Sequence, residues 1–266
     1  MKQIGEGRES KAILFDENTV LLIGKNKTAF ENYKRQQIIY KLLGKKIKSV
    51  QIPNKVKIIK PNKDYPFGAL SMSCVKGEPL DIKACTDKQK ITLGEQIAKI
   101  IDEFQHIGEN FTAKELFELS KVEYKTDETV VSKALKLVET YLTDTEFKKL
   151  VKAAEVYKQL LLNRIRMFCH GDLTNSNLLI DENKNIIGLV DFEVVGFLLP
   201  EYIFRAYRKD DVLFKSVTKD RQIDTYEMGI VEIITMVINL QHFYELGFNE
   251  IEQRVGILRE LLLRLL

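Results

Sequence analysis

The sequence predicts an α+β protein with two lobes, a small β-rich lobe over residues 1–75 and a larger, mainly helical lobe over residues 76–266. Three observations predict this division. Short apolar runs separated by turn signals fill most of the first 75 residues. From residue 87 onward, long segments place apolar residues at the i, i+3, i+4, i+7 spacing of helices. One alternating hairpin pattern, over residues 178–191, interrupts these helical segments.

The elements of the first lobe follow from its apolar runs. "KAILF" and "TVLLIG" flank the turn signal "DEN", which predicts an antiparallel hairpin, and a short strand, "KQI", precedes it. Residues 28–43 carry apolar and aromatic side chains on one helical face, and Gly44 is the expected stop. "KVKIIK" and "GALSMSCV" are two further strand candidates.

The second lobe begins after "KGEPL" with a predicted helix over residues 87–107. A second helix is predicted over residues 143–163, because Thr143 and Glu146 have the spacing of a capping box. "LLID" and "IIGLVD" then alternate around "ENKN" as a hairpin, and helices are expected from about residue 201 to the end. The closing "GILRELLLRLL" has helical periodicity, and we interpret it as a helix packed on the core rather than on a membrane surface.

Composition places the chain among soluble cytoplasmic proteins. Apolar residues make up 45% and charged residues 30% of the 266 residues. The start, "MKQIGEGRES", has no apolar core, and no uncharged apolar run reaches the ~18 residues of a membrane span. The three cysteines are far apart, as in a reducing compartment, and the three histidines have no metal-ligand spacing.

Charge is distributed unevenly along the chain. Residues 1–76 carry 16 Lys or Arg against 6 Asp or Glu, a balance of +10, whereas residues 77–266 carry 25 against 32, a balance of −7. The Lys-rich stretch "GKKIKSVQIPNKVKIIKPNK" has no interleaved aromatic residues, so we interpret it as solvated surface and expect no nucleic-acid partner. The acidic second part instead favours a cationic ligand.

The stretch "CHGDLTNSNLLIDENKNIIGLVDFE", residues 169–193, contains the side chains best suited to chemistry. Asn177 follows Asp172 by five positions and Asp191 follows Asn177 by fourteen, with the predicted hairpin between them. The alternative without chemistry is a structural hairpin with polar residues at its ends. Amide and carboxylate oxygens suit Mg²⁺, however, and a nearby carboxylate suits the orientation of an attacking hydroxyl in phosphoryl transfer. H-x-D-x-x-x-x-N followed by D-F also matches the catalytic set of protein kinases.

Two departures point away from protein kinases themselves. Gly171 stands where the protein-kinase motif has Arg, and no A-P-E stretch follows Asp191. "CHGDLTNSNLLI" and "IIGLVDFE" instead resemble the aminoglycoside phosphotransferase family, which includes choline-kinase-like and other small-molecule kinases. "IGEGRESKAI" resembles the nucleotide loop of that family, nearest to its 2″-phosphotransferase branch, and "LSMSCVKGEPL" resembles its interlobe hinge. The resemblance implies a two-lobed, protein-kinase-like fold.

The resemblance also implies roles for the matching residues and two cofactors, Mg²⁺ and ATP or GTP. Asp172 would be the catalytic base, and His170 would brace its loop. Asn177 and Asp191 would bind the metal. The nucleotide site would hold the remaining matches: Gly5, Gly7 and Ser10, whose backbone amides approach the phosphates, and Met72, Ser73 and Val75, which line the adenine site.

The nucleotide lysine of the family has no direct match. Its position falls near Ile23, and Lys25, two residues on and therefore on the same strand face, is the candidate replacement. The following helix has Gln36 and Gln37 where the family has a glutamate partner, and neither supplies a charge.

The expected function is transfer of the γ-phosphate to a hydroxyl of a small, cationic molecule such as an aminoglycoside. Two alternatives stay open: a metabolic kinase for choline, homoserine, thiamine or a sugar, and a pseudokinase that binds nucleotide without transfer. Beyond Asp191, "VVGFLLPEYIF" lacks the Asp that the family often has, and Glu201 is a candidate substitute. The acidic residues considered for the substrate site are Glu201, Asp210, Asp211, Asp224 and Glu227.

Overall fold

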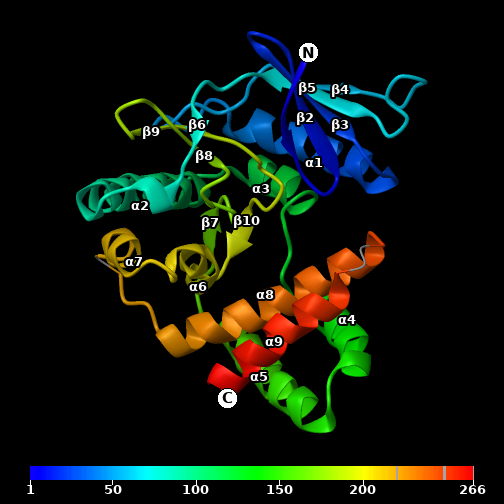
Figure 1. Ribbon diagram of the computed structural model, residues 1–266, viewed down its shortest axis with the longest axis vertical. Helices are drawn as coiled ribbons and strands as arrows, with labels where there is room; N and C mark the ends of the chain where they lie inside the picture. Colours follow the sequence, from blue (N-terminus) through cyan, green and yellow to red (C-terminus); the bar gives the residue numbers. More distant parts are fainter. Residues whose placement is uncertain (220, 248–249, 266) are drawn as a thin grey trace. The chain divides into compact units, whose positions relative to one another are not determined.

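The computed structural model describes residues 1–219, 221–247 and 250–265, and it contains two compact units (Figure 1). Unit 1 comprises Met1–Tyr124 and Phe168–Gly196, and unit 2 comprises Lys125–Met167 and Phe197–Leu266. The predicted α+β class is confirmed, with an N-terminal antiparallel sheet and a helical C-terminal part. The units divide the chain differently from the predicted lobes, whose boundary at residues 75 and 76 stays a prediction.

Unit 1 begins with a five-stranded antiparallel sheet in the order β1-β2-β3-β5-β4. The predicted hairpin over residues 11–24 is confirmed, with β2 and β3 pairing in register from Ser10 and Gly24. A bulge between Gln3 and Gly5 interrupts the pairing of the first two strands. The strands are β1 (Lys2–Glu6), β2 (Ser10–Asp16), β3 (Thr19–Gly24), β4 (Lys57–Ile59) and β5 (Ala69–Ser73).

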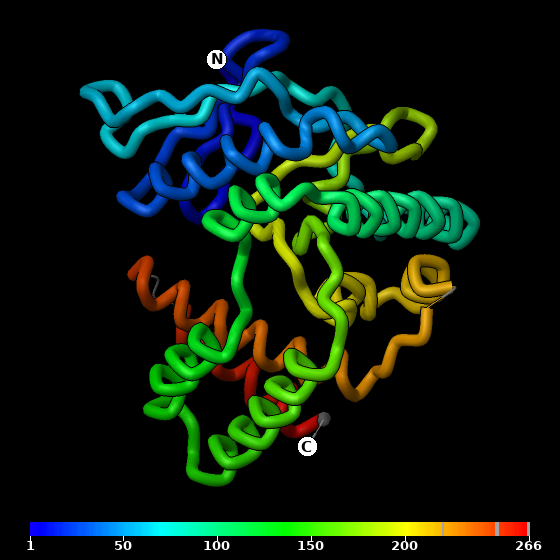
Figure 2. Tube along the Cα trace, turned by 180° about the vertical axis from the view of Figure 1, so that it is seen from behind, coloured from blue at the N-terminus to red at the C-terminus, as the bar shows by residue number. Residues whose placement is uncertain are grey.

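Helix α1 (Lys27–Leu43) runs along this sheet (Figures 1 and 2). It begins where the Asn26 side chain accepts hydrogen bonds from two backbone N–H groups of the first turn. The predicted end at Gly44 is confirmed, although Gly44 has a right-handed φ of −58° rather than the left-handed conformation common at such ends. The buried face includes Tyr33, Gln36 and Tyr40, and all three carry polar groups toward the rest of unit 1.

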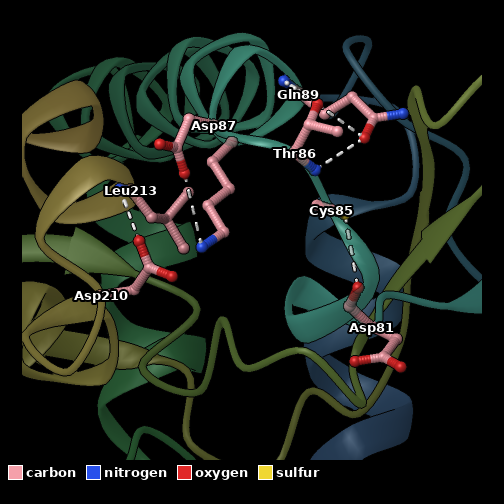
Figure 3. Close-up of polar contacts among 8 residues, drawn as sticks. Asp81, Cys85, Thr86, Asp87, Gln89, Asp210 and Leu213 are labelled. Carbon is pink, nitrogen blue, oxygen red and sulfur yellow. Dashed lines mark hydrogen bonds and ion pairs between the residues drawn. The ribbon is translucent and has the colours of Figure 1, made fainter.

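Three strands build the second sheet of unit 1, in the order β6-β8-β9. The hairpin β8 (Leu178–Ile180) and β9 (Ile186–Leu189) confirms the predicted hairpin, and β6 (Glu78–Pro79), which the sequence did not predict, pairs with β8. Helix α2 (Asp87–Glu109) begins with a capping box between Thr86 and Gln89, and a 3₁₀ turn, η1 (Ile82–Ala84), precedes it (Figure 3). Helix α3 (Ala113–Ser120) was also not predicted.

Unit 2 is helical, and among its described helices α8 (Thr225–Glu245) contributes the most buried residues. The predicted capping box of Thr143 and Glu146 is confirmed at the start of α5 (Asp144–Asn163). Helix α9 (Ile251–Leu265) packs on α8 with Val255, Leu258 and Leu262 buried, which confirms the packed interpretation for the described part of the closing segment. The other elements are α4 (Glu128–Val138), η2 (Glu139–Tyr141), α6 (Pro200–Phe204), η3 (Arg205–Tyr207) and α7 (Asp211–Val217).

The chain passes between the units three times, once between Tyr124 and Lys125 and twice within short strands, β7 (Met167–Cys169) and β10 (Gly196–Leu198). In the described ranges, no helix combines the length and the apolar character that crossing a membrane requires.

Candidate active site

The residues after β7 form a loop that Gly171 makes possible. Gly171 has a φ of +77°, a left-handed conformation that side chains with a Cβ adopt only at a cost of about 1 kcal/mol or more. This turn places His170 inward, fully buried, and Asp172 immediately after it. The backbone conformation therefore explains why glycine separates the two residues of the H-G-D motif.

His170 lies among aromatic rings in the core of unit 1. Its ring meets Phe192 edge-on at 4.6 Å and Phe104 at 6.0 Å between centroids, and its Nδ1 accepts a hydrogen bond from the Asp172 N–H at 3.4 Å. Burial lowers the pKa of His170 to about 3, although backbone groups of Val190 and Asp172 act in the opposite direction. The imidazole is thus neutral and supports the loop.

This burial predicts acid sensitivity. Because the folded pKa is about 3 and the unfolded value is 6.5, only the unfolded chain binds this proton between those values, so stability falls as pH decreases from 6.5 toward 3. Through this group the wild-type protein should lose about 2 kcal/mol of unfolding free energy between pH 7.5 and pH 5. We expect His170→Gln not to show this loss. Urea unfolding of both proteins at the two pH values measures this, and equal acid sensitivity would contradict it.

Asn177 ties the loop together. Its Nδ2 donates to the backbone carbonyl and to carboxylate Oδ2 of Asp172, both at 2.9 Å. Its Oδ1 accepts only a long hydrogen bond of 3.4 Å from Ser176 among the contacts the structure gives. Its backbone carbonyl accepts the Val190 N–H at 3.0 Å, which brings Asp191 to the same loop. Three predicted site residues, Asp172, Asn177 and Asp191, are therefore assembled in one place within unit 1.

Asp191 adopts an uncommon conformation with a φ of +66°. Its carboxylate keeps solvent-exposed surface, yet the surrounding protein displaces much of its water. This desolvation, with the charge of Asp172 as the next cause, raises the pKa of Asp191 to about 6, while the Glu193 N–H acts against the shift. The two aspartates thus repel each other, and a bound cation would relieve that repulsion.

The donor set fits Mg²⁺ but not a metal cage made by protein alone. Among the described residues, no three His, Cys, Asp or Glu side chains are arranged to hold a metal ion. Mg²⁺ in phosphoryl-transfer sites commonly takes one or two protein carboxylates and completes its shell with phosphates and water. One carboxylate from Asp191 and the amide oxygen of Asn177 meet that requirement.

Two acidic residues near this loop were not predicted as site residues. Glu193, the last residue of D-F-E, accepts a hydrogen bond from Gln36 Nε2 at 2.9 Å. Desolvation, with the charges of Asp191 and Glu9 next, raises the pKa of Glu193 to about 8. Glu9, in the glycine-rich loop, is 5% exposed and accepts a hydrogen bond from Asn32. The acidic third residue of D-F-E was the available sequence signal.

The glycine-rich loop joins β1 to β2. Gly7 N–H donates to the Ser10 carbonyl at 2.8 Å, and the Ser10 hydroxyl lies 2.7 Å from the hydroxyl of Tyr33. Neither Gly5 nor Gly7 has a positive φ, and a Cβ on either would make only ordinary contacts at 3.6 Å. The fold itself therefore does not require glycine at positions 5 and 7. Close approach of a ligand to the backbone is another reason for glycine there.

The predicted adenine residues lie at the end of β5 and beyond it. Met72 is 6% exposed, and Ser73 uses both its N–H and its Oγ on the Asn54 backbone, each at 2.8 Å. The Ser73 N–H is therefore engaged, and its carbonyl is the group that could meet a base. A Cβ on Gly188 of β9 would lie 2.5 Å from Val75 Cγ1, so this glycine permits the close approach of β9 to Val75.

The acidic candidates of unit 2 fall into two groups. Asp210 caps α7 by accepting the Leu213 N–H at 3.0 Å (Figure 3), and Asp211 lies exposed in the first turn of that helix. In the other group, Asp224 caps α8, and Glu227 pairs with Arg164.

Glu201 is the buried member of the second group. It is 3% exposed, and its Oε2 has no hydrogen-bond partner in the part of the chain that the structure describes. Burial raises the pKa of Glu201, Arg164 lowers it, and the charges of Glu227 and Asp224 raise it further. These four side chains therefore share one electrostatic neighbourhood.

A family model, APH, described as the phosphotransferase enzyme family, matches residues 1–202. The chain belongs to this family. The family predicted from the sequence motifs is therefore confirmed, and the chain is a phosphotransferase enzyme by membership. No curated protein sequence matches the chain significantly.

Solved structures share the fold of this phosphotransferase. The GDP complex of wild-type aminoglycoside 2'-phosphotransferase-IIIa matches with a TM-score of 0.80 and 20% identity, over 99% of this chain and 92% of that one. The gentamicin complex of APH(2")-IIa matches at 0.76 and 17%, over 98% and 92%. Choline kinase LicA from Streptococcus pneumoniae matches at 0.66 and 14%, over 99% and 93%. The predicted kinase-like fold is confirmed by these likenesses.

The phosphotransferase departs from the family's motif at the nucleotide lysine, and the structure shows what surrounds that position. Ile23 lies half-buried within β3. Lys25 Nζ lies 2.8 Å from Glu6 Oε1 and 3.1 Å from the Gly7 carbonyl, so it tethers the glycine-rich loop. This pair is partly exposed, and the role of Lys25 toward phosphates stays a prediction.

Proposed function

We propose that this protein transfers the γ-phosphate of ATP or GTP to a hydroxyl of a small cationic molecule in the presence of Mg²⁺. The observation that carries the proposal is the hydrogen-bonded pair of Asp172 and Asn177 in the loop before β8, with Asp191 brought beside it by the hydrogen bond from the Val190 N–H to the Asn177 carbonyl. Membership of a phosphotransferase family supports the same reaction.

The chain's own residues divide the work. Asp172 would orient the attacking hydroxyl and accept its proton late in the reaction. Asn177 uses its amide protons to fix Asp172, which leaves its Oδ1 directed to a cation. Mg²⁺, when bound by Asn177 and Asp191, would neutralise the charge that develops on the phosphate oxygens. His170, neutral and buried, holds the loop without exchanging protons.

The nucleotide would contact the glycine-rich loop and the segment after β5. Gly5, Gly7 and the backbone of Ser10 would approach the phosphates, and Lys25 would supply positive charge beside them. Met72 and the carbonyl of Ser73 would meet the base, with Val75 beyond. Enzymes of similar fold are described in complexes with GDP, ADP and ATP, which supports either purine donor.

The acceptor would be cationic because three acidic side chains of unit 2 gather near one another, although the unit as a whole is nearly neutral, with 18 Lys or Arg against 17 Asp or Glu. Glu201 is buried, and Arg164 is the one cation among the described residues that lowers its pKa, against the charges of Glu227 and Asp224, which raise it. APH(2") enzymes of similar fold are described in complexes with kanamycin and gentamicin, which agrees with an amine-bearing acceptor. Asp210 and Asp211 belong to the same proposal only through their charge.

The test is Mg²⁺-dependent release of nucleoside diphosphate from ATP and from GTP, against aminoglycosides, amino alcohols and sugars. Release that requires a cationic acceptor supports the proposal. A best acceptor such as choline, homoserine, thiamine or a sugar would instead indicate a metabolic kinase, in line with the choline kinase neighbour. Tight nucleotide binding with no release would favour a pseudokinase, which the isoleucine at position 23 makes the specific alternative.

Glu201 gives a prediction for the acceptor site. We expect Glu201→Gln, which keeps the shape and removes the charge, to raise the KM for a cationic acceptor about tenfold or more, because a desolvated ammonium loses its counter-charge. The KM for nucleotide should not change. Glu139→Gln removes an equal charge from an exposed position of unit 2 and is the control. Equal KM values for the acceptor in both variants would contradict the assignment.

A further inference from the structure

Helix α1 contacts every residue of the D-F-E segment. The Tyr40 hydroxyl lies beside the backbone of Asp191 and Phe192, which acts to lower its pKa, and its ring centroid lies 4.9 Å from that of Phe192. Gln36 Nε2 donates to Glu193 Oε1 at 2.9 Å. Arg35, one residue earlier, directs Nη2 to the Glu193 carbonyl at 3.5 Å. One helix face thus holds three consecutive residues.

The Gln36 contact stands out because of its environment. Gln36 is 1% exposed, and its Oε1 has no hydrogen-bond partner among the described residues. Burial removes this glutamine amide from water, which costs free energy. Among the described residues the amide makes a single hydrogen bond, the one to Glu193. The strand position that would carry a lysine partner for this helix carries Ile23 instead, so α1 has no ammonium to bind there.

The segment that Gln36 holds needs support. Asp191 is held at a φ of +66°, a conformation that costs about 1 kcal/mol or more for a residue with a side chain and persists only where neighbouring contacts fix it. Glu193 is two residues away, and its backbone N–H lies close enough to the Asp191 carboxylate to lower the pKa of that group. A shift of Glu193 is therefore transmitted directly to the carboxylate that would bind the metal.

We propose that Gln36 is a positioning residue: through its hydrogen bond to Glu193 it holds the Asp191 carboxylate in place for the metal–nucleotide complex. In this chain a hydrogen bond from the Gln36 amide to the Glu193 carboxyl group takes the place of a helix-to-lysine ion pair. The inference rests on the proposed function only in taking a metal–nucleotide complex as the ligand of Asp191.

The neighbouring glutamine supplies a matched control. Gln37 lies on the same helix, but its Nε2 donates to the Val56 carbonyl at 3.2 Å and does not reach the D-F-E segment. Gln36→Met and Gln37→Met therefore remove the same group from adjacent positions. Methionine keeps the length of the side chain, so neither variant opens a large cavity.

Two readouts test the proposal. The first is hydrogen exchange of the backbone amides of residues 191–193, without metal or nucleotide. The second is the Mn²⁺ concentration that gives half-maximal binding of a fluorescent ATP or GTP analogue. We expect Gln36→Met to accelerate exchange and to raise the Mn²⁺ requirement 10- to 100-fold, the usual effect of losing a residue that orients a metal ligand. Gln37→Met should stay within twofold of wild type in both.

Variants of Glu193 separate positioning from a direct charge role. Glu193→Gln keeps an oxygen that accepts from Gln36 and should stay within about threefold of wild type, whereas Glu193→Met should match Gln36→Met. The double variant Gln36→Met/Glu193→Met should be no worse than either single variant, because both remove one interaction. Additive losses, or a Glu193→Gln defect as large as that of Glu193→Met, would overturn the proposal.

Transfer assays keep this inference distinct from the proposed function. A wild-type protein that transfers phosphate to no acceptor refutes the proposed function, yet the exchange comparison still decides the role of Gln36. If transfer is observed, Gln36→Met should lower kcat about tenfold or more with an unchanged KM for the acceptor. Wild-type exchange at residues 191–193 in Gln36→Met would overturn the proposal whatever the transfer assay shows.

Discussion

Asp172→Asn is expected to lower the rate of phosphate transfer by about 10²- to 10⁴-fold, the range over which a general base contributes to a reaction. Asparagine keeps an oxygen that can accept from Asn177 Nδ2, so the loop should retain its hydrogen bond. It cannot take the proton of the attacking hydroxyl. The measurement is kcat at saturating nucleotide and acceptor, with nucleotide affinity measured in parallel.

A second aspartate of the same stretch provides the control for this variant. Asp181 lies in the β8–β9 turn, where its carboxylate accepts hydrogen bonds from Asn185 N–H and Nδ2. Asp181→Asn should leave kcat within about twofold of wild type. If Asp172→Asn retained more than about a tenth of the wild-type rate with an unchanged rate-limiting step, Asp172 would not be the base.

Asp191→Asn should affect metal binding and stability in opposite directions. Loss of the carboxylate should weaken Mg²⁺-dependent nucleotide binding by about 10²-fold, since a charged ligand becomes a neutral one. The same change removes the repulsion between Asp191 and Asp172, so the metal-free protein should have a higher Tm. Asparagine tolerates the left-handed conformation that Asp191 adopts, so backbone strain does not confuse the comparison.

Thermal unfolding without metal and nucleotide titration at several Mg²⁺ concentrations measure these two effects. A fall in Tm together with intact metal dependence would mean that Asp191 serves structure rather than metal binding. A lower metal affinity together with a higher Tm would be diagnostic of a metal ligand. A carboxylate that binds metal beside another carboxylate destabilises the metal-free protein through charge repulsion.

Local signals in the sequence predicted the elements that local physics decides. The β2–β3 and β8–β9 hairpins, the extent of α1 and the Thr143 capping box were all readable because turn residues and periodic apolar side chains lie within a few positions of one another. The H-G-D-x-x-x-x-N and D-F motifs could be read in the same way, and the structure brings their three polar residues together from the two ends of the β8–β9 hairpin.

Contacts between distant residues could not be read. Strand β6 consists of Glu78 and Pro79 and exists only because it pairs with β8, about a hundred residues later. Two adjacent glutamines look equivalent in the sequence, yet Gln36 reaches Glu193 and Gln37 reaches Val56. Lengths and periods do not specify such partners, because tertiary packing decides which face of a helix meets which loop.

The alternation of the two units along the chain also affects how the protein is made. Unit 1 is encoded in two pieces, and residues 125–167 of unit 2 leave the ribosome between them. A nascent chain that ends at Tyr124 can form β1 to β5 but lacks β8, β9 and the whole stretch from Asp172 to Asp191. Folding during synthesis can therefore build the N-terminal sheet early, while the catalytic loop must wait for a later segment to return to a partly formed unit. Truncation of the gene after Tyr124 would yield the N-terminal sheet without the stretch from Asp172 to Asp191.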